Sequence, residues 1–198
     1  MTEGGAVASG RPSNRTRRLV VSLVLLVAAF GACRGREAPD FRPTSTIKDI
    51  MDSMVDPSAD VIWESVATII TIAGTEEKAP QTDDEWKAVR RGAIRIIEAT
   101  NLLLMPGRHV ARPGEKAENE NIELAPEEIE ARLNQDRVSW ITLAHGLHDA
   151  GMTALHAIDA KDPPALSVAG EGLDRACENC HLKYWYPPGK APSSISVR

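Results

Sequence analysis

Five consecutive residues near the carboxyl end of this 198-residue chain, Cys177-Glu178-Asn179-Cys180-His181, restrict its fold more than any other stretch. On a helix, Cys177, Cys180 and His181 occupy positions i, i+3 and i+4, so the three side chains project from one face. The spacing C-x-x-C-H is the attachment motif of c-type haem, in which both thiols add to porphyrin vinyl groups and the histidine ligates the iron. The motif therefore predicts one covalently attached haem c on a helix.

Two other interpretations of this motif stay open, namely a structural zinc site and a thiol redox pair with a histidine beside it. Structural zinc normally takes four protein ligands, often from a second Cys or His pair at short spacing. The chain has three cysteines and no second cysteine pair. The spacing therefore favours haem over zinc, and the remaining cysteine, Cys33, needs a separate explanation.

Residues 1–33 are typical of a bacterial export signal. The basic residues that come first are Arg11, Arg15, Arg17 and Arg18. An apolar run over residues 19–30 follows, broken only by Ser22, and it is too short for a convincing transmembrane span. The stretch Phe30-Gly31-Ala32-Cys33 resembles a lipobox with phenylalanine where leucine is usual, which predicts cleavage before Cys33 and its acylation. We expect an exported protein, anchored on the periplasmic side of a membrane; an uncleaved anchor and an ordinary cleaved signal are the alternatives.

The charge balance is acidic, with 23 Lys and Arg against 28 Asp and Glu and a formal charge of −5. Removal of residues 1–32 takes away four basic residues and one acid, which leaves 19 basic and 27 acidic residues and a charge of −8. An acidic body favours docking to basic partner surfaces over anionic lipid. The chain has no basic stripe and no aromatic stacking platform, which argues against nucleic-acid binding.

The remainder of the chain is predicted to be all-helical, after a charged tether at residues 34–43. The amphipathic segments cover residues 44–74, 82–106, 125–162 and 163–186, with Pro57 interrupting the first and a break before Trp140 in the third. Thr44 or Ser45 is the expected cap of the first helix. Residues 106–126 predict a long surface crossover loop, and the acidic run Glu115 to Glu130 is expected to be solvated. No segment has the pattern of a strand, and residues 187–198 predict a flexible tail.

The chain combines four predicted amphipathic helices with Cys177, Cys180 and His181 on the last one, and the aromatic residue Tyr184 follows three residues after His181. In these features it resembles the class II c-type cytochromes, the cytochrome c-prime and cytochrome c-556 group. The resemblance covers roughly residues 44–186. It implies an antiparallel four-helix bundle with covalent haem on the C-terminal helix. Class I cytochromes differ, because their motif lies near the amino end and a methionine follows it.

The chain departs from that family at two positions. Trp185 stands where members often have arginine or lysine, and Ile47 stands where an arginine often precedes the distal haem position. Lys48 or Lys183 is the candidate to pair with a haem propionate instead.

The second axial ligand decides the function that the resemblance implies. In the c-556 group a methionine of the first helix gives a six-coordinate iron suited to electron transfer, whereas cytochrome c-prime has an apolar or aromatic side chain there and binds small gases. Met51 falls at the position that resembles the distal one, and Met54, one turn on, is the runner-up. The alternative is that both methionines fill gaps in the core. His145, His148 and His156 are surface or core histidines, or else a second metal site or an alternative distal ligand.

The sequence thus predicts an exported monohaem c-type cytochrome that carries single electrons between redox partner proteins and is not an enzyme. Two alternatives stay open: a five-coordinate haem protein that binds nitric oxide or other small gases, and a zinc-stabilised structural module. A dimer is compatible with the resemblance, although no feature of the sequence requires one.

Overall fold

The computed structural model describes residues 41–186. The predicted export signal, the lipidation candidate Cys33, most of the tether and the tail at residues 187–198 lie outside the described residues. No helix within residues 41–186 is long and apolar enough to cross a membrane.

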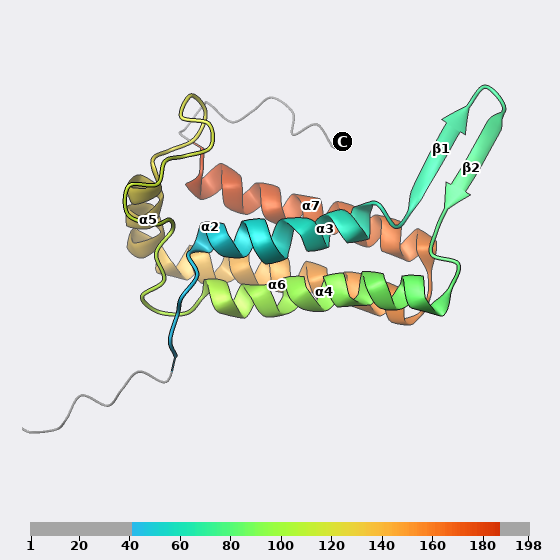
Figure 1. Ribbon diagram of the computed structural model, residues 1–198, viewed down its shortest axis with the longest axis horizontal. Helices are drawn as coiled ribbons and strands as arrows, with labels where there is room; N and C mark the ends of the chain where they lie inside the picture. Colours follow the sequence, from blue (N-terminus) through green and yellow to red (C-terminus); the bar gives the residue numbers. More distant parts are fainter. Residues whose placement is uncertain (1–40, 187–198) are drawn as a thin grey trace, which may run out of the picture. The chain divides into compact units, whose positions relative to one another are not determined.

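The described part of the chain is mostly helical and forms a helical bundle (Figure 1). The elements are α2 (Ile47–Ile50), η1 (Met51–Val55), α3 (Asp56–Trp63), β1 (Ala67–Thr71), β2 (Gly74–Lys78), α4 (Asp83–Leu103), α5 (Pro126–Gln135), α6 (Arg137–Asp159) and α7 (Pro163–Tyr184). Helix α6 packs against both α4 and α7, and α3 packs against the same two helices from the other side. The short helix α5 lies across the end of the bundle that holds α2.

The first helical segment is continuous from α2 to α3 but changes its geometry in the middle. Its cap is Thr46 rather than the predicted Thr44 or Ser45, because the Thr46 side chain accepts from the Asp49 N–H while the Asp49 carboxylate accepts from the Thr46 N–H. The turn η1 is π-helical, and the Asp56 N–H donates to the Met51 carbonyl. The α-helix is therefore interrupted beside Pro57, as predicted. Across the π-helical turn, the buried residues Ile50 and Val55 are five positions apart instead of the three or four of a regular α-helix.

The prediction that this helix continues to Gly74 is wrong, as is the prediction that no segment forms a strand. Helix α3 ends at Trp63, whose indole N–H donates to the Gly170 carbonyl at 3.0 Å. Strands β1 and β2 then form an antiparallel hairpin in which Ala67 pairs with Lys78 and Thr71 with Gly74. The β-branched run of β1 favours an extended chain, and every hairpin residue is exposed, so the isoleucines there do not join the core.

The other helices confirm the predictions because their ends carry local signals. Thr82 caps α4 in a capping box with Glu85, Asp136 separates α5 from α6, and Asp162 caps α7 ahead of Pro163. Residues 104–125, hereafter the crossover segment, contain no helix or strand, as expected. The expectation that this segment is a surface loop is only partly right, because Val110 and Leu124 are buried.

Candidate functional site

Helix α7 carries Cys177, Cys180 and His181 on the face that points toward the first helical segment. Both thiols are free and half-buried. With Met51 from the opposite helix, the three side chains line an inner cavity of about 20 Å³. The rest of its wall is mainly apolar and consists of Val55, Asp56, Leu103, Trp140, Leu143, Ala144, Leu147 and Ala176.

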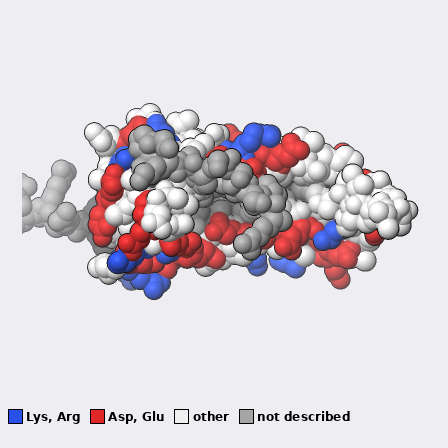
Figure 2. Space-filling model, turned by 90° about the horizontal axis from the view of Figure 1, so that it is seen from above, with Lys and Arg blue, Asp and Glu red and all other residues white. Residues whose placement is uncertain are grey.

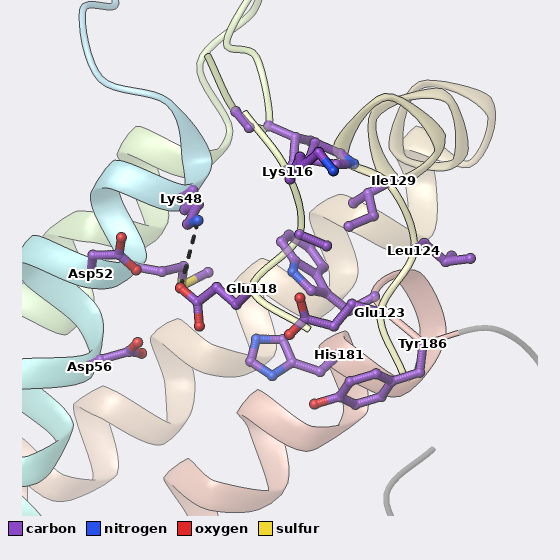
Figure 3. Close-up of a pocket in the computed structure, with 16 residues that line it drawn as sticks. Lys48, Asp52, Asp56, Lys116, Glu118, Glu123, Leu124, Ile129, His181 and Tyr186 are labelled. Atoms are coloured by element: carbon purple, nitrogen blue, oxygen red, sulfur yellow. Dashed lines mark ion pairs between the residues drawn. The ribbon is translucent and has the colours of Figure 1, made fainter. Parts of the chain in front are cut away.

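A second, outer cavity of about 130 Å³ shares Met51, Asp56 and His181 with the inner one. Charged side chains from α2, η1, α3 and the crossover segment surround it (Figure 3), and they are Lys48, Asp52, Asp56, Lys116, Glu118 and Glu123. Met54 lines neither cavity and packs against the hydrophobic core instead. Of the two candidate methionines, only Met51 therefore lies on the same cavities as His181.

Burial keeps the donor groups of α7 uncharged near neutral pH. Loss of solvent raises the pKa of Cys177 to about 12 and that of Cys180 to about 12. Burial lowers the pKa of His181, and the nearby negative charge of Glu123 opposes this effect. The site therefore offers two neutral thiols and a neutral imidazole, which is the form of histidine that binds a metal.

The crossover segment bridges the first helix and α7 over the outer cavity. Its backbone joins α2 through the Ile47 N–H, which donates to the His109 carbonyl at 2.9 Å, and it joins the end of α7 through the Leu124 N–H, which donates to the Trp185 carbonyl at 2.8 Å. Lys48 adds ion pairs at 3.1 Å to Glu115 and at 3.7 Å to Glu118.

Most acidic residues of the run from Glu115 to Glu130 are exposed, as the sequence predicted, and the exceptions, which are half-buried, are Glu115, Glu123 and Glu130. Glu118 and Glu123 also line the outer cavity, which the sequence did not predict. No local signal could have found them, because their position depends on the path of the chain between α4 and α5. On the face seen in Figure 2, acidic side chains are spread along the surface with basic ones between them.

The two lysines proposed for haem propionates differ in position. Lys48 lines the outer cavity, and Lys116, which the sequence analysis did not single out, does too. Lys183 pairs with Asp136 at 2.7 Å and its ammonium lies 5.6 Å from the centre of the Tyr184 ring. It lines neither cavity.

The histidines of α6 are separate from this site. Neither cavity is lined by His145, His148 or His156, so a role as distal ligand does not fit the arrangement. Within residues 41–186, no group of three or more His, Cys, Asp or Glu side chains is positioned to hold a metal ion. The second metal site considered for these histidines is therefore not supported by the described part of the chain.

The residues around the inner cavity match the chemistry of a covalently held porphyrin. Two thiols and an imidazole lie on one helix face, a thioether lies on the opposite wall, the inner wall is mainly apolar, and cationic side chains stand at the outer rim. A porphyrin is larger than either cavity.

Comparison with known proteins finds no matching family model, no matching curated protein and no matching solved structure. The function is therefore inferred from the site itself.

Proposed function

We propose that this chain is an exported monohaem c-type cytochrome of the class II kind, an antiparallel four-helix bundle that carries single electrons. The observation that carries the proposal is the convergence of Cys177, Cys180 and His181 with Met51 on one cavity. The haem supplies the redox chemistry, because its iron alternates between the ferric and ferrous states.

Each residue of the site has a distinct part in this proposal. Cys177 and Cys180 hold the group through thioethers and so fix it against α7. His181 would hold the iron through its imidazole. Met51, from the facing helix, would offer its thioether to the same iron, and a neutral thioether favours ferrous iron and so raises the reduction potential. No side chain is assigned to make or break a bond in a substrate, so the protein is proposed not to be an enzyme.

The helix packing supports the class II assignment. Helix α6 contacts α4 and α7, and α3 contacts the same two helices, which is the adjacency that a four-helix bundle requires. Trp140 and Tyr184 are both buried and their rings meet edge to face at 5.9 Å, and Trp140 also lines the inner cavity. The hairpin of β1 and β2 is an addition that this resemblance does not predict.

The surroundings of the site bear on its partners. Lys48 and Lys116 at the rim of the outer cavity are the candidates to pair with propionates. The acidic surface favours redox partners with basic docking surfaces, and lipidation at Cys33 would hold the domain at the membrane.

A second candidate function is the binding of nitric oxide or another small gas by five-coordinate iron. It is favoured by the outer cavity of about 130 Å³, which reaches Met51 and would give a small molecule access to the distal side. The two functions differ in whether the Met51 thioether would occupy the sixth coordination position of the haem iron.

The absorption spectrum of the ferrous protein with and without carbon monoxide separates them. Electron transfer predicts low-spin iron that resists carbon monoxide in the wild type and in Met54→Ala, and high-spin iron that binds it in Met51→Ala. High-spin wild-type iron that binds carbon monoxide readily would establish the gas-binding alternative. If the protein contained no haem after expression with its export signal, the zinc-stabilised structural module would be the remaining hypothesis.

A further inference from the structure

We propose that the hairpin of β1 and β2 joins two copies of this chain, with β1 pairing antiparallel to β1 of the second copy in one four-stranded sheet. The inference is independent of the proposed function, because it uses no residue of either cavity. The hairpin projects away from the end of the bundle where α3 ends and α4 begins (Figure 1), and every residue of both strands is exposed. Within residues 41–186, no backbone hydrogen bond joins either strand to a segment outside the hairpin.

The outer edge of β1 presents unpaired backbone groups. Alternate residues of an antiparallel strand direct their N–H and C=O groups to one neighbouring strand, and the residues between them direct theirs to the opposite side. Because Thr71 pairs with Gly74 across a two-residue turn, Thr68 and Ile70 belong to the outward set. A row of such groups on an exposed edge is a template for pairing with another strand.

The two edges of the hairpin differ in charge. Strand β1 has no charged side chain, whereas β2 carries Glu76, Glu77 and Lys78. If β2 paired with its own copy around its central residue, Glu76 would lie opposite Glu76 of that copy, and like charges directly opposite each other are destabilising. Pairing of β1 with β2 of another copy would leave a free edge and continue without closing. Pairing of β1 with β1 instead closes at two copies, because charged β2 strands then form both outer edges.

Two-fold symmetry fixes the register of this pairing. In an antiparallel pair of identical strands with two-fold symmetry, one residue lies opposite its own copy. Ile69 is the centre of the five-residue strand β1, so all five residues are paired when Ile69 lies opposite Ile69 of the second copy. Thr68 then lies opposite Ile70 of the second copy, and the outward backbone groups of these two residues meet. The contacts are between β-branched side chains, which favour strand pairing.

The exposed isoleucines fit a second strand better than a lipid surface. Ile70 is 80% exposed, and Ile72 in the turn is fully exposed. Insertion into lipid would bury these side chains, but it would also bury the unpaired backbone groups of the strand edge, which lipid cannot satisfy. A second copy pairs the backbone groups and covers Ile70 at the same time.

Sedimentation equilibrium of the full chain tests the pairing, in a density-matched detergent that accommodates the predicted lipid anchor. We expect the wild type to show a monomer–dimer equilibrium. Ile69→Lys would place two ammonium groups opposite each other at the symmetry axis, and we expect it to weaken association by roughly tenfold. The hairpin itself is expected to persist in this variant, because the new cation opposes Glu76 of the same hairpin.

The matched control is Thr75→Lys, which adds the same charge at an exposed position of β2, and we expect it to associate like the wild type. A monomeric wild type would overturn the proposal and leave lipid or a strand of another protein as the occupant of this edge. Equal association constants for Ile69→Lys and Thr75→Lys would also overturn it.

A disulfide tests the register without relying on the strength of association. Directly opposite residues that are not hydrogen-bonded have Cα atoms about 4.5 Å apart, which is within the range of disulfides. Ile69→Cys is therefore expected to form a covalent dimer under mild oxidation, seen by non-reducing electrophoresis. Thr75→Cys, and the wild type with the same native cysteines, are expected to stay monomeric in this assay. A covalent dimer equally abundant in Ile69→Cys and Thr75→Cys, or absent from both, would contradict pairing through β1.

Discussion

A methyl group added at Gly151 tests how closely α4 and α6 approach in the bundle. A Cβ atom at this position would lie 2.9 Å from Ile97 Cγ1 and 3.6 Å from Ile96 Cγ2. Both isoleucines are buried, and β-branched side chains have few rotamers with which to move away. Gly151→Ala must therefore displace packed atoms of α4.

The matched control is Gly146→Ala in the same helix, where an added Cβ would meet no atom within 4 Å. Both substitutions gain about 1 kcal/mol from the better helix propensity of alanine. Only Gly151→Ala incurs the cost of overpacking, which is typically about 1–3 kcal/mol. We expect Gly146→Ala to be more stable than the wild type, and Gly151→Ala to be less stable than Gly146→Ala by about 1–3 kcal/mol.

Urea denaturation followed by circular dichroism measures this difference, provided that the slope of the free energy of unfolding against urea is the same in both variants. Equal midpoints for the two variants would refute the close packing of α4 against α6.

Three further predictions concern single polar groups. Ser58→Ala should raise the free energy of unfolding by about 1 kcal/mol, because the buried Ser58 hydroxyl has no hydrogen-bond partner among the described residues; a midpoint below that of the wild type would contradict this. Tyr184→Phe should lower it by about 1 kcal/mol, because the Tyr184 hydroxyl donates to the Asp136 carbonyl at 3.1 Å, and an unchanged thermal midpoint would argue against that bond. Hydrogen bonds from the N–H groups of Thr82 and Gln81 lower the pKa of Glu85 in the folded protein below its ordinary value of 4.5. The Glu85 carboxylate therefore contributes its full stabilisation at pH values above 4.5. This stabilisation is lost as the pH falls through the lower pKa of the folded state. The advantage of the wild type over Glu85→Ala in thermal melts should therefore shrink on acidification below that pH, and an advantage that grows would contradict the assignment.

The parts of the fold that the sequence predicted correctly are those with local chemical signals. Thr82 with Glu85, and Asp162 before Pro163, mark helix starts through contacts within a few residues. The motif on α7 was equally local, since its three side chains share a face on any helix. Met51 lines the same inner cavity as the motif, and its ligation of iron stays a prediction.

The parts that the sequence did not predict depend on contacts between distant segments. Ile69 and Ile70 continue an apolar pattern, but α3 ends where Trp63 reaches the Gly170 carbonyl, and the isoleucines emerge on an exposed hairpin. Ile50 and Val55 are five residues apart and would not lie on the same face of a regular α-helix. The π-helical turn between them contains one extra residue, which allows both side chains to be buried. Glu123 lines the outer cavity together with His181 only because the crossover segment returns to the end of α7.

The most direct test of the central claim is the intact mass of the full chain, expressed with its export signal in a host that attaches c-type haem. We predict that the polypeptide gains the mass of one haem, which survives acid-acetone extraction and is lost when Cys177 and Cys180 are both replaced by alanine. A wild-type chain whose mass includes no haem, or a haem that the solvent extracts, would contradict the claim that this cavity holds a covalent haem.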